Sequence, residues 1–320
     1  MDPQSLPASV AWEGAFSSTP RRASPEEAAQ FCRRLTMGRR ENFAVLSRVL
    51  RPELRDDFAA LYSFCRCADD LGDEVGSPDH ALDLLVWWRG ELQKCLAGEP
   101  HHPVFVALAV VIRKHRLPAK PFEQLLSAFE QDQRKTRYAT FEDLLGYCRL
   151  SANPVGRLVL MLLGEDRDGA QPLMSDCLCT ALQLANHWQD VKGDLLERNR
   201  IYLPREFIAA RARGDFEARL RLTCQHGHAP DREFLGVFHE AMDAAMKQTW
   251  PFLRTGEALV ERLRPENRAV VWLFGAGCRA IMSRIQDWNG ETCLGRPQIS
   301  RWQRASLLAS AWWKHRTGSI

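Results

Sequence analysis

The chain has 320 residues, of which 45% are hydrophobic and 26% are charged, enough to bury a sizeable core. Its formal net charge of +3 is nearly balanced, so the composition argues against a dedicated nucleic-acid-binding surface. Ten cysteines are scattered through the sequence, and we expect them to be reduced thiols in a cytoplasmic protein. The substrate or binding partner must therefore be inferred from local motifs.

The first residues and the longest apolar run argue against a secretory leader and a membrane span. Residues 1–22 have neither the basic start nor the apolar stretch of a signal peptide, and we expect a flexible arm there. The longest apolar run, 104–112, is about half of the ~20 residues that a membrane span requires. Peripheral contact with a membrane stays open, because an exposed apolar helix or a basic patch would suffice.

Helical signals dominate from residue 24 onward. Ser24, Pro25 and Glu27 form a capping box that predicts the start of a helix. Apolar residues then recur at spacings of three and four, as between Phe234 and Trp250. Clusters of proline and glycine near 76–78, 98–103, 117–121, 164–172, 264–266 and 290–297 divide roughly ten helical segments. These signals predict an all-α, single-domain bundle over 23–290, with a C-terminal helix in 291–320 packed on the same domain.

Two pairs of acidic residues lie within the segment 62–74. Asp69 and Asp73 are four residues apart, and so are Asp70 and Glu74, so each pair shares one face of a helix. Such like-charge pairs cost about 0.2–0.5 kcal/mol each, and we expect a cation to offset them. On its own this string is as consistent with a solvated helix face as with a binding site.

A second polar stripe makes a binding site the better hypothesis. Gln183, Asn186, Asp190 and Asp194 follow one another at +3, +4 and +4, and apolar residues surround them. One or two carboxylates per helix, completed by water and phosphate oxygens, are how proteins hold Mg²⁺. Two such stripes can bridge metal ions to a diphosphate and stabilise it as a leaving group.

Basic and aromatic residues near these stripes are candidates for contacts with phosphate and with a carbocation. Arg66 and Arg200 lie close to the carboxylates in sequence, although a single arginine is more often an ordinary surface residue. Tyr62, Phe43 and Tyr147 can line a cavity and stabilise a cation, although aromatic residues at helical spacing more often pack a core.

The two motifs together resemble those of the squalene and phytoene synthase family, the trans head-to-head prenyl synthases. The resemblance covers about residues 30–290 and rests on YSFCRCADDLGDE and QLANHWQDVKGDLLERNRIYLP. It implies an isoprenoid-synthase-type helical bundle with a central cavity, several Mg²⁺ ions bridged by diphosphate, and an isoprenoid diphosphate as substrate. The implied metal ligands are Asp69, Asp73, Asp190 and Asp194. The resemblance implies Tyr62, Tyr147 and Asn186 as catalytic residues and Arg66 as a substrate-binding residue. From the residues themselves, further candidates for substrate binding are Phe43, Asn153, Gln183 and Arg200.

Within the family, ENFAV at 41–45 and SANPVG at 151–156 look most like the bacterial hopanoid-pathway branch that makes hydroxysqualene. That resemblance implies conversion of presqualene diphosphate to hydroxysqualene with water and without NADPH. It also suggests other enzymes of that pathway as partners. Asn153 is a candidate for positioning the water, but Asn153-Pro154 is equally consistent with a helix kink. Arg39-Arg40, and an Arg200 one residue later than usual, depart from the family pattern.

Two alternatives remain open at the level of sequence. The first keeps the fold and joins two farnesyl or geranylgeranyl diphosphates head to head, giving presqualene diphosphate, squalene or phytoene. The second is a non-catalytic helical assembly factor with the same fold.

Overall fold

The computed structural model describes residues 6–12, 22–38, 49–228 and 232–317. Over these residues the chain is helical, with an isolated bridge between Arg137 and Ile201 in place of a sheet, and the predicted all-α class is confirmed. Contacts between Cα atoms divide the chain into two compact units, one of residues 1–134 and 157–167 and one of residues 135–156 and 168–320. Helix α8, Asn153–Leu163, contributes residues to both units.

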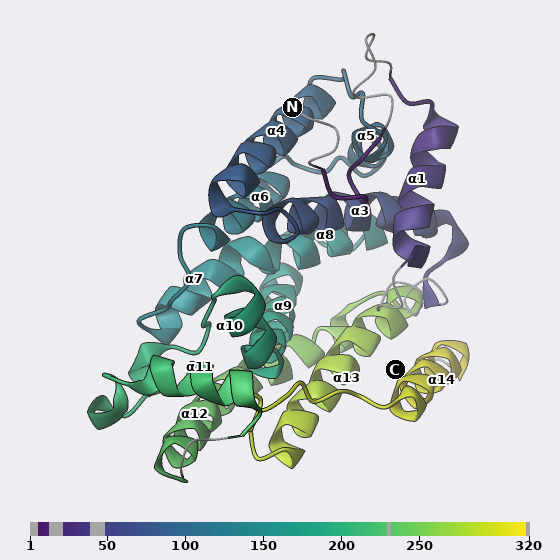
Figure 1. Ribbon diagram of the computed structural model, residues 1–320. Helices are drawn as coiled ribbons and strands as arrows, with labels where there is room; N and C mark the ends of the chain where they lie inside the picture. Colours follow the sequence, from purple (N-terminus) through teal and green to yellow (C-terminus); the bar gives the residue numbers. More distant parts are fainter. Residues whose placement is uncertain (1–5, 13–21, 39–48, 229–231, 318–320) are drawn as a thin grey trace. The chain divides into compact units, whose positions relative to one another are not determined.

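The first unit packs around α3 (Figure 1). Its helices are α1 Pro25–Gly38, α3 Arg55–Asp73, α4 Pro78–Leu96, α5 Pro103–His115 and α6 Lys120–Asp132. Phe64 of α3 meets Phe122 of α6 edge to face at 5.3 Å between ring centroids, and Trp88 of α4 lies 4.4 Å from Phe105 of α5. Because these rings are fully buried, they fix α3 in the middle of the unit.

Helix α1 begins as the sequence predicts. The Ser24 amide donates to Glu27 Oε2 at 2.8 Å, and the Glu27 amide donates to Ser24 Oγ at 3.2 Å, which is the reciprocal pattern of a capping box. Two amide groups that the helix itself leaves unpaired are thereby satisfied.

Residues 6–12 pack against the first unit. The Val10 side chain is fully buried, and its carbonyl lies 2.9 Å from Nε2 of the buried His102. His102 Nδ1 accepts from the Val104 amide at the start of α5, so Nε2 carries the proton and donates to Val10. The Cys67 thiol of α3 donates to the Ser9 carbonyl at 3.3 Å. This segment therefore lies beside the acidic motif of α3.

The second unit is built on α9 and α12, which pack along each other (Figure 1). Its helices are α7 Phe141–Ser151, α9 Ala170–Gln189, α10 Val191–Arg198, α11 Phe216–His226, α12 Arg232–Glu257, α13 Pro265–Asp287 and α14 Arg301–Thr317. The predicted apolar stripe of α12 is confirmed, with Phe234, Phe238 and Met242 buried. Trp188 Nε1 donates to Thr249 Oγ1 at 2.8 Å and satisfies the buried indole of α9.

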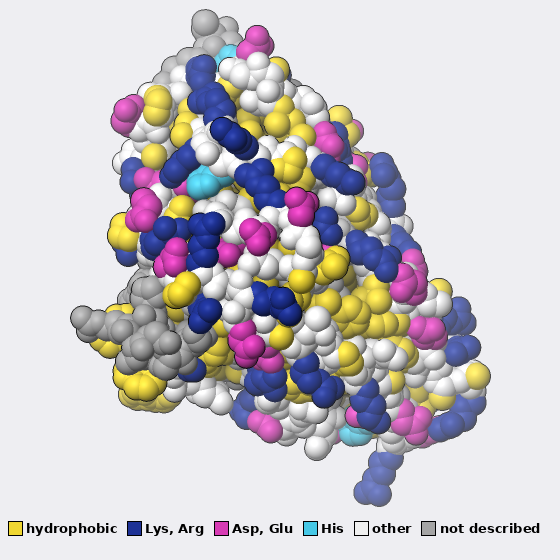
Figure 2. Space-filling model, turned by 180° about the vertical axis from the view of Figure 1, so that it is seen from behind, with side chains coloured by type: hydrophobic (Ala, Val, Ile, Leu, Met, Phe, Trp, Pro, Cys, Tyr) yellow, Lys and Arg dark blue, Asp and Glu magenta, His cyan; other side chains and the backbone are white. Residues whose placement is uncertain are grey.

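The surface shows mixed charge. In Figure 2 basic and acidic side chains are interspersed over the visible face, in keeping with the nearly balanced net charge. In the part of the chain that the structure describes, the helices are all too short or too polar to span a bilayer.

Candidate functional site

The first acidic motif lies on the C-terminal turns of α3, which is one continuous helix from Arg55 to Asp73. Arg66 supplies the predicted offsetting cation. Its guanidinium contacts three carboxylates, Asp69 at 3.2 Å, Asp70 through two hydrogen bonds, and Glu74 at 3.2 Å. Three of the four acidic side chains of the motif are therefore paired with one arginine from the same helix.

Asp70 and Asp69 play different parts in this motif. Asp70 is 1% exposed, and its burial raises the pKa of the carboxyl above its usual value, against the opposing effects of Ser9 and Arg66. Burial acts to lower the pKa of Arg66, but the charges of Asp69 and Asp70 outweigh that effect and raise it. The Asp69 side chain is 43% exposed and is accessible to a ligand. Asp70 thus anchors Arg66, while Asp69 faces outward.

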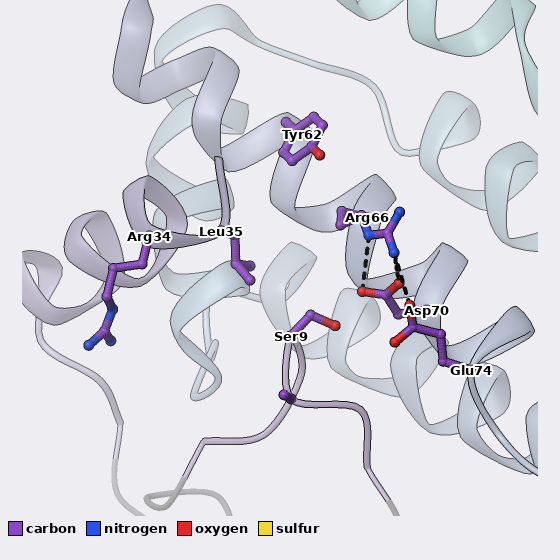
Figure 3. Close-up of a pocket in the computed structure, with 8 residues that line it drawn as sticks. Ser9, Arg34, Leu35, Tyr62, Arg66, Asp70 and Glu74 are labelled. Carbon is purple, nitrogen blue, oxygen red and sulfur yellow. Dashed lines mark hydrogen bonds and ion pairs between the residues drawn. The ribbon is translucent and has the colours of Figure 1, made fainter. Parts of the chain in front are cut away.

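A cavity of about 270 Å³ opens beside this motif (Figure 3). Tyr62, Arg66, Asp70 and Glu74 line it from α3, Arg34 and Leu35 from α1, and Ala8 and Ser9 from the N-terminal segment. Tyr62 and Arg66, both predicted site residues, therefore share one cavity. Ser9 is a lining residue that the sequence analysis missed, because no motif marks the segment before α1.

The second motif is not one continuous helix. We predicted that Gln183, Asn186, Asp190 and Asp194 share a single helical face, but α9 ends at Gln189 and α10 begins at Val191. Asp190 sits at the joint with φ −110° and ψ 23°. The Asp190 amide still donates to the Asn186 carbonyl at 3.0 Å, and the Asp194 amide to the Asp190 carbonyl at 2.9 Å. The i to i−4 hydrogen bonds therefore continue on both sides of the break at Asp190.

Asp190 and Gly193 account locally for the break between α9 and α10. The Asp190 carboxylate folds over Gly193, where a Cβ atom would lie 2.7 Å from Asp190 Oδ1. Glycine leaves the space that this carboxylate occupies. Asp190 also pairs with Arg296 at 3.5 Å, and Asp194 with Arg198 at 3.9 Å, both longer than the contacts of Arg66 in α3.

An aromatic cluster lies beside the second motif. The rings of His187 and Tyr202 stack with centroids 3.7 Å apart, and Tyr147 lies within 6 Å of both. Burial, helped by the charge of Arg200, lowers the pKa of His187 to about 3, so the imidazole is neutral. Tyr147 was predicted as a site residue, whereas Tyr202 was not singled out, although it lies within the quoted second motif.

Gln183 and Arg200 are tied to the same cluster. Gln183 Nε2 lies 3.3 Å from His187 Nε2, and Arg200 is buried, with its amide donating to the Asp194 carbonyl at 2.9 Å. Asn186 is exposed on the outer side of α9. The second unit therefore gathers Tyr147, Gln183 and Arg200 around His187.

Asn153 and Pro154 mark a helix boundary. Helix α7 ends at Ser151 and α8 begins at Asn153, so the pair separates two helices instead of kinking one. The buried Asn153 Oδ1 accepts from Thr180 Oγ1 of α9 at 3.0 Å. Phe43 and Arg39-Arg40 lie outside the described residues.

The donor chemistry of both motifs suits a hard cation. Each motif offers partly exposed carboxylate oxygens, at Asp69 and Asp73 in one unit and at Asp190 and Asp194 in the other. Mg²⁺ prefers such oxygens and usually takes its remaining ligands from water and substrate phosphates. The described residues contain no group of three or more His, Cys, Asp or Glu side chains that could hold a metal ion by themselves.

Comparisons with known proteins show which family the chain belongs to. The hydroxysqualene synthase of Rhodopseudomonas palustris is 39% identical over 173 residues, which cover 54% of this chain but only 58% of that relative. The 15-cis-phytoene synthase of Synechococcus elongatus is 27% identical over 304 residues, covering 90% and 94% of the two chains. The crystal structure of squalene synthase HpnC from Alicyclobacillus acidocaldarius superposes with a TM-score of 0.69 at 36% identity, covering 83% of this chain and 95% of that one.

The resemblance drawn from the two motifs is thereby confirmed. The family model described as squalene/phytoene synthase matches residues 37–303, a stretch that contains both acidic motifs. This chain belongs to the squalene/phytoene synthase family.

Proposed function

We propose that this protein is a hydroxysqualene synthase, which converts presqualene diphosphate and water to hydroxysqualene and diphosphate. The observation that carries the proposal is the 39% identity to a hydroxysqualene synthase over 173 residues. The matched stretch covers about half the length of that relative, and the family match over 37–303 extends the relationship to most of the chain.

The two acidic motifs are proposed to hold the diphosphate through Mg²⁺. Asp69 and Asp73 of α3 and Asp190 and Asp194 at the α9–α10 joint would be the protein ligands. Bound Mg²⁺ would supply positive charge where the leaving group becomes more negative. Arg66, Gln183 and Arg200 would contact the substrate, and Phe43 would line its apolar part.

The reaction we propose needs no protein nucleophile. The C–O bond of presqualene diphosphate breaks, and both bonding electrons leave with the diphosphate. The cyclopropylcarbinyl cation rearranges, and Tyr62 and Tyr147 stabilise it through their ring faces while Asn186 helps to orient the substrate. A water oxygen then adds to the cation and loses one proton, so that no reductant is consumed.

Asn153 is proposed to position that water. Its side-chain oxygen accepts from Thr180 Oγ1, and this bond fixes the orientation of the amide. The NH₂ group is then the part of Asn153 left to donate to a water oxygen. Replacement of Asn153 by Asp would keep the size and lose that donor.

The test is a product assay. Purified protein with Mg²⁺ and presqualene diphosphate should release hydroxysqualene, identified by mass spectrometry, without NADPH and with ¹⁸O incorporated from labelled water. Chelation of the metal with EDTA should stop the reaction, and added Mg²⁺ should restore it. Absence of hydroxysqualene under these conditions would refute the assignment.

Head-to-head condensation is a second candidate, favoured by the extent of two matches. The phytoene synthase match spans 90% of this chain, and the structure of 36% identity is that of a squalene synthase. Incubation with farnesyl diphosphate or geranylgeranyl diphosphate separates the two proposals. Presqualene diphosphate, squalene or phytoene formed from these substrates would favour condensation.

We also propose a cytoplasmic enzyme in peripheral contact with a membrane. Hydroxysqualene is almost entirely hydrocarbon, so its transfer into a lipid phase is far more favourable than its release into water. Flotation of the protein with vesicles tests this contact.

A further inference from the structure

Helix α14 carries an unusual exposed surface. Trp302, Trp312 and Trp313 are 86%, 52% and 58% exposed, and they account for three of the four strongly exposed tryptophans among the described residues. Tryptophan is a large apolar side chain with a single polar group, so its exposure in water is costly. Three such side chains on one helix of the second unit indicate that this surface contacts something other than bulk water.

The exposed apolar residues form one face of α14. Trp302, Ala305, Ala309 and Trp312 follow at spacings of three, four and three, and Trp313 adjoins them. We call these five residues the tryptophan face. They are all exposed, whereas Leu307, Leu308 and Ala311 on the other side are buried or half-buried.

The opposite side of α14 is already occupied by α13, which lies beside it (Figure 1). The ammonium of Lys314 lies over the ring of Trp272 of α13, 5.3 Å from its centroid. The helix is therefore held in place by one apolar side and presents a second one outward. A surface helix of a water-soluble protein ordinarily has polar residues on that side.

The C-terminal segment that carries the tryptophan face has charged residues of one sign. Residues 294–320 contain five lysines and arginines and no aspartate or glutamate. Arg301 and Arg304 lie on the first turn of α14 and are exposed. Each basic residue held near an anionic lipid surface contributes favourably to binding, and tryptophan prefers the level of the lipid headgroups.

We propose that the tryptophan face of α14 and its basic residues bind the surface of an anionic membrane. This inference names the surface for the peripheral contact proposed above and depends on that proposal alone. A second copy of the chain is the competing occupant. Two copies paired through the same face would bring like charges together, whereas anionic headgroups complement them.

The test is sedimentation of the full chain with vesicles, without substrate. The protein should sediment with vesicles of phosphatidylcholine and phosphatidylglycerol, and much less with phosphatidylcholine alone. Trp302→Ser with Trp313→Ser should weaken binding on the order of tenfold or more. Arg301→Gln with Arg304→Gln should weaken it about 30-fold at low salt, since each charge contributes about fivefold.

Matched variants control for general loss of fold. Leu173→Ser removes an apolar side chain that is 63% exposed on α9, and Arg205→Gln with Arg211→Gln removes two exposed charges elsewhere. Both should bind vesicles as the unaltered protein does, and circular dichroism should match in all variants.

Two results would overturn the proposal. The first is an unaltered protein that does not bind anionic vesicles, or α14 variants that bind them as strongly as the unaltered protein does. The second is a dimer in size-exclusion chromatography that the tryptophan variants dissociate, which would assign the face to a second copy. Neither result bears on the product assay, so the proposed reaction is judged separately.

Discussion

The two acidic motifs show contrasting ways of carrying like charges. On α3 the helix is continuous, and Arg66 contacts three carboxylates from within it. At the α9–α10 joint the helix breaks at Asp190, and the aspartates make ion pairs of 3.5 and 3.9 Å with Arg296 and Arg198. The first motif is stabilised by short local pairing, whereas the second lies at a break between two helices and makes longer ion pairs.

This contrast predicts different responses to a diphosphate. A ligand at α3 competes with carboxylates for Arg66, or else binds with Arg66 still attached to the buried Asp70. At the joint, the ion pairs of Asp190 with Arg296 and of Asp194 with Arg198 are longer, at 3.5 and 3.9 Å. We therefore expect substitutions on α3 to affect both stability and activity, and substitutions at the joint to affect mainly activity.

Removal of the outward carboxylates of α3 should have the largest effect. Asp69→Asn with Asp73→Asn should lower kcat by about 10³-fold or more, because both proposed metal ligands lose their charge. Steady-state product formation measures this, with circular dichroism to confirm the fold.

Asp79 and Asp83 provide a matched control on the next helix. They are also four residues apart and are exposed on α4, so Asp79→Asn with Asp83→Asn removes the same charge at the same spacing. Activity should be unchanged. Equal loss of activity in both double variants would show that overall charge, and not the α3 site, matters.

Substitution of Arg66 should come next and should act on stability. Arg66→Gln leaves the buried Asp70 carboxylate without its main partner, and we expect about 3–5 kcal/mol lower free energy of unfolding. Urea unfolding followed by circular dichroism measures it. Arg66→Gln with Asp70→Asn removes both charges and should recover at least half of the loss. No recovery would contradict the view that Asp70 serves chiefly as the anchor for Arg66.

Much of this architecture could be predicted from sequence because the signals are local. The capping box at Ser24 and the apolar stripe of α12 depend on neighbouring residues, and both occur as predicted. The cation expected beside Asp69 and Asp70 is Arg66, one helical turn away. Helical spacing alone determines these contacts.

Other features depend on contacts distant in sequence and could not be predicted. Ser9 lines the cavity because the neighbouring Val10 carbonyl accepts a hydrogen bond from His102, 92 residues away. The break at Asp190 depends on the fold of its carboxylate over Gly193, which spacing of three and four does not reveal. The stacking of His187 on Tyr202 likewise follows from the path of the chain after α10.

Acid should destabilise the protein through the buried His102 of the first unit and the buried His187 of the second. Burial lowers the pKa of His102 to about 4, from 6.5 in the unfolded chain. Below pH 6.5 the unfolded state binds the proton first, so the free energy of unfolding falls as the pH drops from 6.5 to about 4. For His102 we expect a loss of about 2–3 kcal/mol across that window.

His102→Asn should flatten this pH dependence, because asparagine can accept from the Val104 amide and donate nearby without titrating. Urea unfolding at several pH values measures the slope. His101→Asn is the control, since His101 is exposed and adjacent. An unchanged slope in His102→Asn would assign the acid sensitivity to other groups, with His187 in the second unit the first to examine.

Gly193→Ala should have the smallest effect on activity and stability. It tests the α9–α10 joint without changing α3. The added Cβ would lie 2.7 Å from Asp190 Oδ1, so the carboxylate must move from its place. Because alanine favours helix more than glycine does, stability should hold or rise by up to about 1 kcal/mol while activity falls roughly tenfold. Gly277→Ala on α13 adds the same methyl group where no atom lies within 4 Å, and its activity should stay unchanged. A Gly193→Ala enzyme with full activity would show that the position of the Asp190 carboxylate is not critical, and the contrast between the two motifs would then lie in charge alone.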